Sequence, residues 1–111
     1  MATPADLRSL TLVELAAAIR DRRVSSVEAT RACLDALGTT GVKLNAVADC
    51  DPERALADAA RADRELARDE PRGPLHGVPL AHKDMFHRRG RVSAYGSRIA
   101  ADNVRSDTAT V

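Results

Sequence analysis

GPLHGVPLAHKDMF, residues 73–86, holds the signals from which the fold is predicted. Gly73 and Pro74 end any helix that precedes them, because both residue types interrupt helical backbone. Residues 78–82 then form a short apolar run, which predicts a buried β-strand. The proline of this run lies near its start, where a missing backbone N–H is best tolerated. The stretch therefore predicts a loop followed by a strand, with Lys83 at the end of the strand.

Lys83 is the candidate catalytic residue of this stretch. Burial disfavours the charged ammonium form of a lysine, so a lysine beside a buried strand can lose its proton near neutral pH. Such an amine can act as a general base, whereas an arginine cannot. Of the 17 basic residues only Lys43 and Lys83 are lysines, which makes the choice of lysine here informative. On spacing alone an alternative stays open, in which Lys83 extends to the surface or pairs with Asp84 or another acidic residue.

These residues resemble the first motif of the amidase signature family, G-P-L-x-G-[IV]-P followed by a hydrophobic stretch and Lys-Asp. Residues 95–111, YGSRIAADNVRSDTATV, resemble the next segment of that family, although residues 107–111 depart from its Asp-Ala-x-Val pattern by one residue. His82 stands where the family more often has an aliphatic residue. The resemblance covers essentially the whole chain and is most specific in residues 73–84.

The resemblance implies an α/β fold, namely the N-terminal part of the amidase signature α/β/α fold with a mixed central sheet, here truncated. Residues 1–111 are then one partial domain. We expect a helical hairpin over residues 11–38, and the first strands and helices of the amidase core over residues 44–111. Asp107 resembles the N-cap of a helix that the chain does not complete, which indicates truncation.

The same resemblance implies hydrolysis of amide C–N bonds through a Ser–cis-Ser–Lys triad, without a cofactor or a metal ion. Lys83 matches the lysine, which takes a proton from a serine bound through a cis peptide; that serine relays the proton from the nucleophilic serine. Ser93, Ser97 and Ser106 lie in no glycine-rich loop that would supply N–H donors to an oxyanion. Both triad serines are therefore expected downstream, and this chain alone is expected to be inactive.

Three rival functions remain open from the sequence. The first, within the family, is a part of glutamyl-tRNA amidotransferase similar to its A subunit, which delivers ammonia rather than releasing it. The second is a non-catalytic remnant or interaction module. The third is nucleic-acid binding through residues 83–111, which carry six basic and three acidic side chains. Few aromatic residues accompany these charges, so we expect no nucleic-acid partner.

The local signals upstream of this stretch predict helices. Thr11 with Glu14 and Ser25 with Glu28 have the spacing of capping boxes, and Asp51 precedes a proline as an N-cap would. The helix after Asp51 is expected to extend to about residue 68, with an alanine-rich stripe packed against a sheet. Further expectations are a loose lead-in over residues 1–10, a helix stop at Gly38 and a weak strand at residues 44–48.

Composition bounds the remaining possibilities. The chain has 44% hydrophobic residues and a net charge of +1, which is typical of a soluble globular protein without a membrane segment. Cys33 and Cys50 form no CxxC pair, so we expect free thiols in the cytoplasm. His76, His82 and His87 have no spacing that suits a metal site. The expected partners are a small-molecule amide substrate and, through open sheet edges, other copies of the chain.

Overall fold

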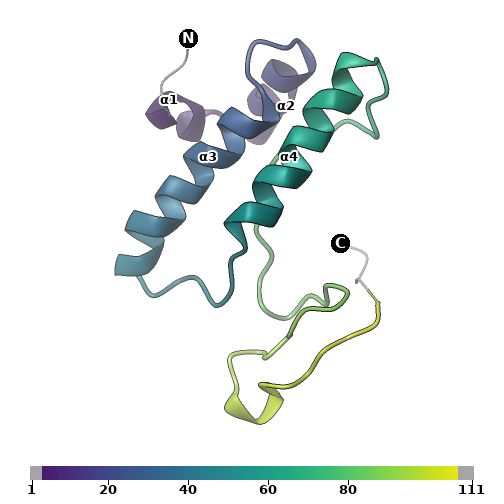
Figure 1. The fold of residues 1–111 in the computed structure, drawn as a ribbon. Helices are drawn as coiled ribbons and strands as arrows, with labels where there is room; N and C mark the ends of the chain where they lie inside the picture. Colours follow the sequence, from purple (N-terminus) through teal and green to yellow (C-terminus); the bar gives the residue numbers. More distant parts are fainter. Residues whose placement is uncertain (1–3, 108–111) are drawn as a thin grey trace. The chain divides into compact units, whose positions relative to one another are not determined.

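The computed structural model describes residues 4–107, and the chain divides into two compact units, Met1–Pro79 and Leu80–Val111. The first unit is helical (Figure 1). Its helices are α1 (Pro4–Ser9), α2 (Leu12–Arg20), α3 (Ser26–Ala36) and α4 (Pro52–Ala67), and a π-helical turn, Leu37–Gly41, continues α3. In the second unit, the regular element is a 3₁₀ turn, Arg98–Ala100.

The predicted α/β fold with a mixed central sheet is wrong, because the described residues contain helices and no β-strand. Residues 78–82, predicted as a strand, have no regular secondary structure. An apolar run becomes a strand only where a neighbouring chain segment accepts its backbone hydrogen bonds, and no strand lies beside residues 78–82 within residues 4–107. The predicted burial is wrong as well, because residues 80–82 are exposed.

The second predicted strand, residues 44–48, is also wrong. The helical path of α3 runs through the π-helical turn and on to residue 43, so Gly38 does not stop it. The backbone N–H of Leu44 donates to the Thr40 carbonyl, and that of Ala46 to the Gly41 carbonyl. Asn45 between them has a φ of 50°, which closes a turn rather than extending a strand.

Both predicted capping boxes are present at the helix starts. The Thr11 hydroxyl accepts the Glu14 backbone N–H, and the Glu14 carboxylate accepts the Thr11 backbone N–H at 2.8 Å. Ser25 and Glu28 repeat this arrangement at α3. In each box the backbone N–H of the capping residue lowers the pKa of the glutamate, with a further contribution from the hydroxyl. Asp51 caps α4 as predicted, accepting the Arg54 N–H.

The core of the helical unit is small and rich in alanine. α3 packs against α1 and α4, and Figure 1 shows α3 and α4 lying side by side. The alanine-rich stripe of α4 therefore faces a helix, not the predicted sheet. The residues of the core cluster are Leu7, Ala18, Ile19, Val24, Ala29, Ala32 and Leu66. Leu7 shows that the predicted loose lead-in was wrong, because it belongs to α1 and is buried.

The second unit is held together by turns and isolated bridges. The backbone N–H of Tyr95 donates to the Asp84 carbonyl, and Ser93 and Asn103 are joined by two hydrogen bonds. Isolated β-bridges join Arg89 to Arg105 and Val92 to Val104. Because such bridges bury little, large apolar side chains stay exposed there: Leu80, Met85, Val92, Tyr95, Ile99 and Val104. The helix expected after Asp107 lies outside the described residues.

Candidate functional site

Lys83 begins the candidate site, and its side chain is exposed. Within residues 4–107, its amine makes no hydrogen bond or ion pair, so the alternative pairing with Asp84 does not occur. The Lys83 carbonyl accepts the backbone N–H groups of Met85 and Phe86, which turns the chain directly after the lysine. The dry surroundings expected from a buried strand are not formed by the described part of the chain, and the catalytic role of Lys83 stays a prediction.

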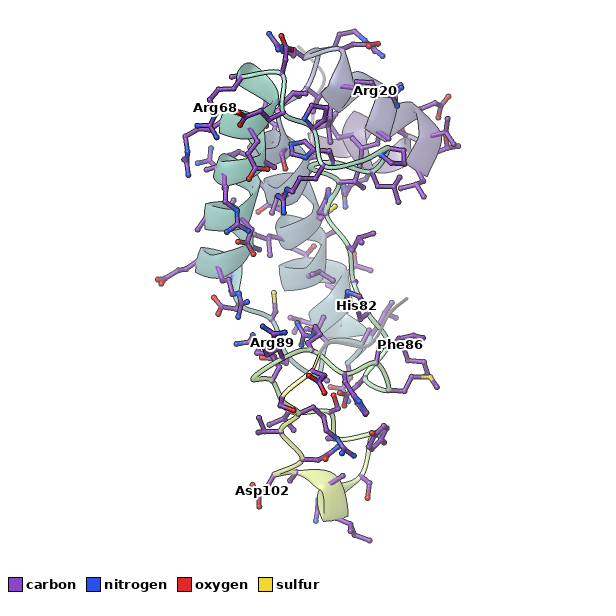
Figure 2. The ribbon with its side chains drawn as sticks, turned by 90° about the vertical axis from the view of Figure 1, so that its right-hand side faces the viewer. Arg20, Arg68, His82, Phe86, Arg89 and Asp102 are labelled. Carbon is purple, nitrogen blue, oxygen red and sulfur yellow. The ribbon has the colours of Figure 1, made fainter. Side chains whose placement is uncertain are left out.

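Asp84 fixes the turn that follows the lysine. Its carboxylate accepts the backbone N–H of Ala94 at 3.3 Å, and its carbonyl accepts that of Tyr95 at 3.1 Å. Asp84 therefore orders backbone in this unit. The rings of His82 and Phe86 meet edge to face on either side of this turn, with centroids 6.4 Å apart (Figure 2).

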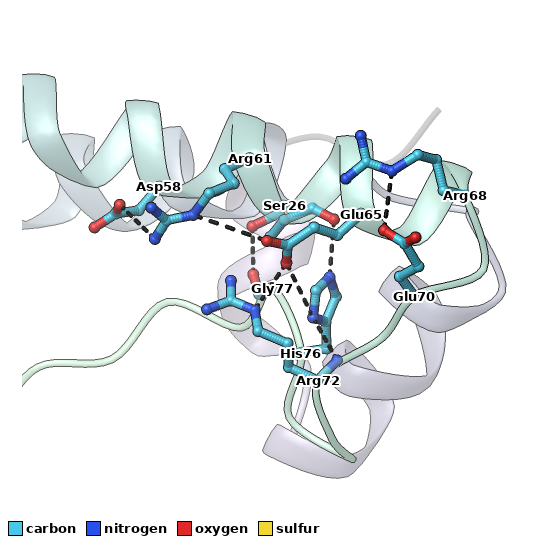
Figure 3. A network of polar contacts seen from close by, with 10 residues as sticks. Ser26, Asp58, Arg61, Glu65, Arg68, Glu70, Arg72, His76 and Gly77 are labelled. Carbon is cyan, nitrogen blue, oxygen red and sulfur yellow. Dashed lines mark hydrogen bonds and ion pairs between the residues drawn. The ribbon is translucent and has the colours of Figure 1, made fainter.

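The motif residues before the lysine lie against the helical unit, and His76 is the first contact. The His76 side chain is 4% exposed. Its Nε2 lies 2.8 Å from the Ala62 carbonyl of α4, and its Nδ1 accepts the Arg72 backbone N–H at 3.1 Å. Both bonds are satisfied together only when the proton is on Nε2, so the contacts select that neutral tautomer. Figure 3 shows the ring directed at the α4 backbone.

Gly77 makes the second contact, against α2 and α3. Its carbonyl accepts a hydrogen bond from the buried Ser26 hydroxyl at 2.5 Å. Its φ is 78°, and a Cβ there would meet Ser26 Cβ at 3.1 Å and Ile19 Cγ2 at 3.3 Å. The position therefore favours glycine for both conformation and space. Val78 follows and packs against the helical core.

Charged side chains surround the His76 contact. Glu65 on α4 is 18% exposed, and its buried Oε2 lies 2.8 Å from Arg72 Nε and 4.0 Å from His76 Nδ1. Arg61 approaches the other oxygen at 3.9 Å (Figure 3). Glu65 thus lies at the margin of the core, where Arg72 of the loop contacts its carboxylate.

Asp63 was missed by the sequence analysis. Its two carboxylate oxygens accept the backbone N–H groups of Ser26 at 2.7 Å and Val27 at 3.1 Å, so α4 caps the start of α3. A signal was present, because Asp63 lies four residues after Ala59 and three before Leu66, on the buried face of α4. A carboxylate on such a face needs hydrogen-bond donors from a neighbouring element.

The serines of the second unit have structural contacts. The Ser93 side chain is buried, and its hydroxyl donates to the Phe86 carbonyl at 3.4 Å. Ser97 caps the 3₁₀ turn by accepting the Ile99 N–H. Ser106 is exposed. That the nucleophile is not among these three residues stays a prediction.

The remaining candidate features are the two cysteines, possible metal ligands, the other two histidines and the length and polarity of the helices. Cys33 and Cys50 are free, and burial raises the pKa of the Cys33 thiol. A search of residues 4–107 finds no cluster of three or more metal-ligating side chains. His82 and His87 lie in the second unit, and the His87 ring contacts the Tyr95 hydroxyl. The helices described here are all too short or too polar to cross a bilayer.

Comparison with known proteins identifies the family. The sequence model of the family described as amidase matches residues 28–111. The chain is 44% identical over 105 residues to the A subunit of glutamyl-tRNA(Gln) amidotransferase from Pelobacter propionicus, which covers 95% of this chain and 21% of that protein. It is 43% identical over 106 residues to the protein of the same name from Acidothermus cellulolyticus, covering 96% of this chain and 21% of that protein.

The chain belongs to the amidase family. The match includes the whole of residues 73–86, so it covers Lys83 and the loop that precedes it. The chain spans about a fifth of the length of the curated relatives it matches.

Proposed function

We propose that this chain supplies Lys83 as the general base of an enzyme that breaks amide C–N bonds. The observation that carries the proposal is the family match over residues 28–111, which includes the Lys-Asp end of the motif. The docked loop supports it, because His76, Gly77 and Val78 hold the first part of the same motif on the helical unit.

In the proposed chemistry, the Lys83 amine accepts a proton from a relay serine, which takes it from the nucleophilic serine. The nucleophile adds to the amide carbonyl, and the proton returns along the same path to the leaving nitrogen as the C–N bond breaks. Water then releases the acyl group. Both serines lie outside this chain, so the chain by itself is expected to hydrolyse no amide.

The exposure of Lys83 fits an active site in which a segment outside this chain supplies both serines. A general base works best when its amine is dry enough to shed a proton and a hydroxyl lies within about 3 Å. Neither condition is met for Lys83 within residues 4–107, where the amine is exposed and makes no hydrogen bond. We expect the segment that carries the serines to cover it.

A chimera tests this proposal. In the Pelobacter propionicus relative, this chain would replace the matching stretch, and amide hydrolysis would be followed as ammonia release. We expect Lys83→Ala to lower kcat about 100-fold or more, the usual contribution of a general base. Lys83→Arg should be equally impaired, because arginine keeps its proton. Lys43→Ala, at the only other lysine, is the matched control and should leave kcat unchanged. Full activity in either Lys83 variant would contradict the proposal.

A second candidate is favoured by the relatives. Both relatives described above are named as the A subunit of glutamyl-tRNA(Gln) amidotransferase. We propose that the enzyme containing this chain passes the released ammonia to an activated carboxyl group, whose leaving group the ammonia displaces, instead of releasing it into solution. With the relative's own partner subunits present, transfer to glutamyl-tRNA that depends on Lys83 would support this role. Ammonia release without transfer would favour a simple amidase.

A further inference from the structure

His76 joins two segments that lie fourteen residues apart in sequence. Its Nε2–H donates to the Ala62 carbonyl of α4, and its Nδ1 holds the Arg72 backbone N–H at the start of the loop. Both ring nitrogens are occupied, and the side chain is 4% exposed. A buried group that makes two bonds with a fixed tautomer orders the backbone on both sides of it.

Contacts of Gly77 and Val78 hold the C-terminal end of the same loop. Ser26 donates to the Gly77 carbonyl, and Val78 packs into the helical core. His76 thus closes a clamp that runs from Arg72 to Val78 and holds the loop to both α4 and α3. Figure 3 shows the His76 contact with α4 and the Gly77 contact with Ser26. The charges that face the ring are the Glu65 carboxylate of α4 and the Arg72 guanidinium of the loop.

We propose that His76 is a positioning residue for Lys83. This inference rests on the proposed function, since it concerns how the base is held. Lys83 follows Val78, the last residue of the clamp, by five residues, and five residues of chain reach at most about 18 Å. We call the segment between the last held residue and Lys83 the tether. If the clamp opened, the tether would begin at Arg72, eleven residues before Lys83.

The length of the tether sets the expected effect. The effective concentration of a tethered group falls roughly as the −3/2 power of the tether length, so lengthening it from five to eleven residues lowers the concentration of the amine at its target about threefold. The loss should appear in kcat, because the amine acts in the chemical step, while KM for the amide stays close to its original value.

Hydrogen exchange on the 111-residue chain tests the clamp directly. His76→Ala removes both bonds, so we expect the Arg72 and Val78 amides to exchange about tenfold faster or more, while α4 amides keep their protection. His76→Asn keeps an acceptor where Nδ1 was and should protect the Arg72 amide. His76→Gln keeps a donor where Nε2 was and should not protect the Arg72 amide.

His82→Ala, at an exposed histidine of the same motif, is the matched control for hydrogen exchange and should change neither amide. Unchanged exchange in His76→Ala would overturn the inference.

The chimera tests whether the clamp serves the base. We expect His76→Ala to lower kcat about threefold at nearly constant KM, with His76→Asn and His76→Gln intermediate and Lys43→Ala, outside the motif, at the parent value. If Lys83→Ala abolishes activity and His76→Ala retains full kcat, the positioning role is wrong although the proposed function stands. If Lys83→Ala is fully active, the proposed function fails, and the positioning role fails with it whatever hydrogen exchange shows.

Discussion

Ile19 in the helical unit is 1% exposed, whereas Ile99 in the unit that follows is 99% exposed. The same contrast holds for hydrogen bonds. The helical unit satisfies its backbone within helices and caps its helix starts, while residues 80–107 rely on turns, two isolated bridges and one 3₁₀ turn. The unit that carries the candidate base therefore has the weaker internal support, and the motif before the base is held by the helical unit.

The largest expected effect is on the buried isoleucine. Ile19→Ala should lower the free energy of unfolding by about 3 kcal/mol, because it removes a fully buried side chain and leaves a cavity. Ile99→Ala, the matched change at an exposed site, should alter it by less than about 0.5 kcal/mol. Urea unfolding followed by helical circular dichroism measures both. Equal effects would show that the two units do not differ in packing as described.

Gly77→Ala is expected to cost about 2 kcal/mol, the sum of a left-handed φ and two contacts that must widen. Gly73→Ala changes the same loop where no atom lies within 4 Å of the new Cβ and no left-handed φ is present, so it should be close to neutral. Thermal unfolding of the two variants side by side gives the comparison. A neutral Gly77→Ala would contradict the close docking of the loop on α2 and α3.

Asp63→Ala should cost about 1.5 kcal/mol, because two backbone N–H groups at the start of α3 lose a charged acceptor. Asp58→Ala on the same helix removes an exposed carboxylate paired only with surface arginines and should cost less than about 0.5 kcal/mol. Urea unfolding of both variants decides whether α4 caps α3. A cost for Asp63→Ala no larger than that for Asp58→Ala would count against the cap.

The smallest expected effect is on the pH dependence of folding stability below neutral pH. The folded-state pKa values of Glu14 and Glu28 are lowered, so their stabilisation is fully present above the unfolded value of 4.5 and is lost as pH falls through the folded values. The Glu14→Gln, Glu28→Gln double variant lacks this titration. Its stability difference from the parent protein should therefore be constant between neutral pH and about pH 4.5 and should shrink below that range. A difference that grows in acid would refute the assignment.

Local chemistry made the helix starts predictable. Thr11 with Glu14 and Ser25 with Glu28 form hydrogen bonds with each other over three residues, and Asp51 accepts the Arg54 N–H over the same distance along the chain. Interactions this short depend on neighbouring residues alone, so no knowledge of the remaining chain was required.

The errors came from features that depend on partners. Residues 78–82 have the apolar pattern of a strand, but pairing requires a second strand that the described residues do not contain. Asp63 and His76 find their partners 37 and 14 residues away along the chain. The place of Asp63 on the buried face of α4 indicates that it needs a donor, but it does not indicate which element supplies the donor. The candidate base Lys83 was identified from the sequence motif that contains it, not from the environment of its side chain in the fold.

The amino-acid sequence was enough to predict the capped helix starts, the free thiols and the family to which Lys83 and its motif belong. The caps and the motif depend on residues that lie close together along the chain. The folded chain was needed to establish that α4 packs on a helix, that Asp63 caps α3, and that His76 and Gly77 hold the loop before the lysine. Those contacts join distant residues, and a contact across space exists only once the backbone has brought its two sides together.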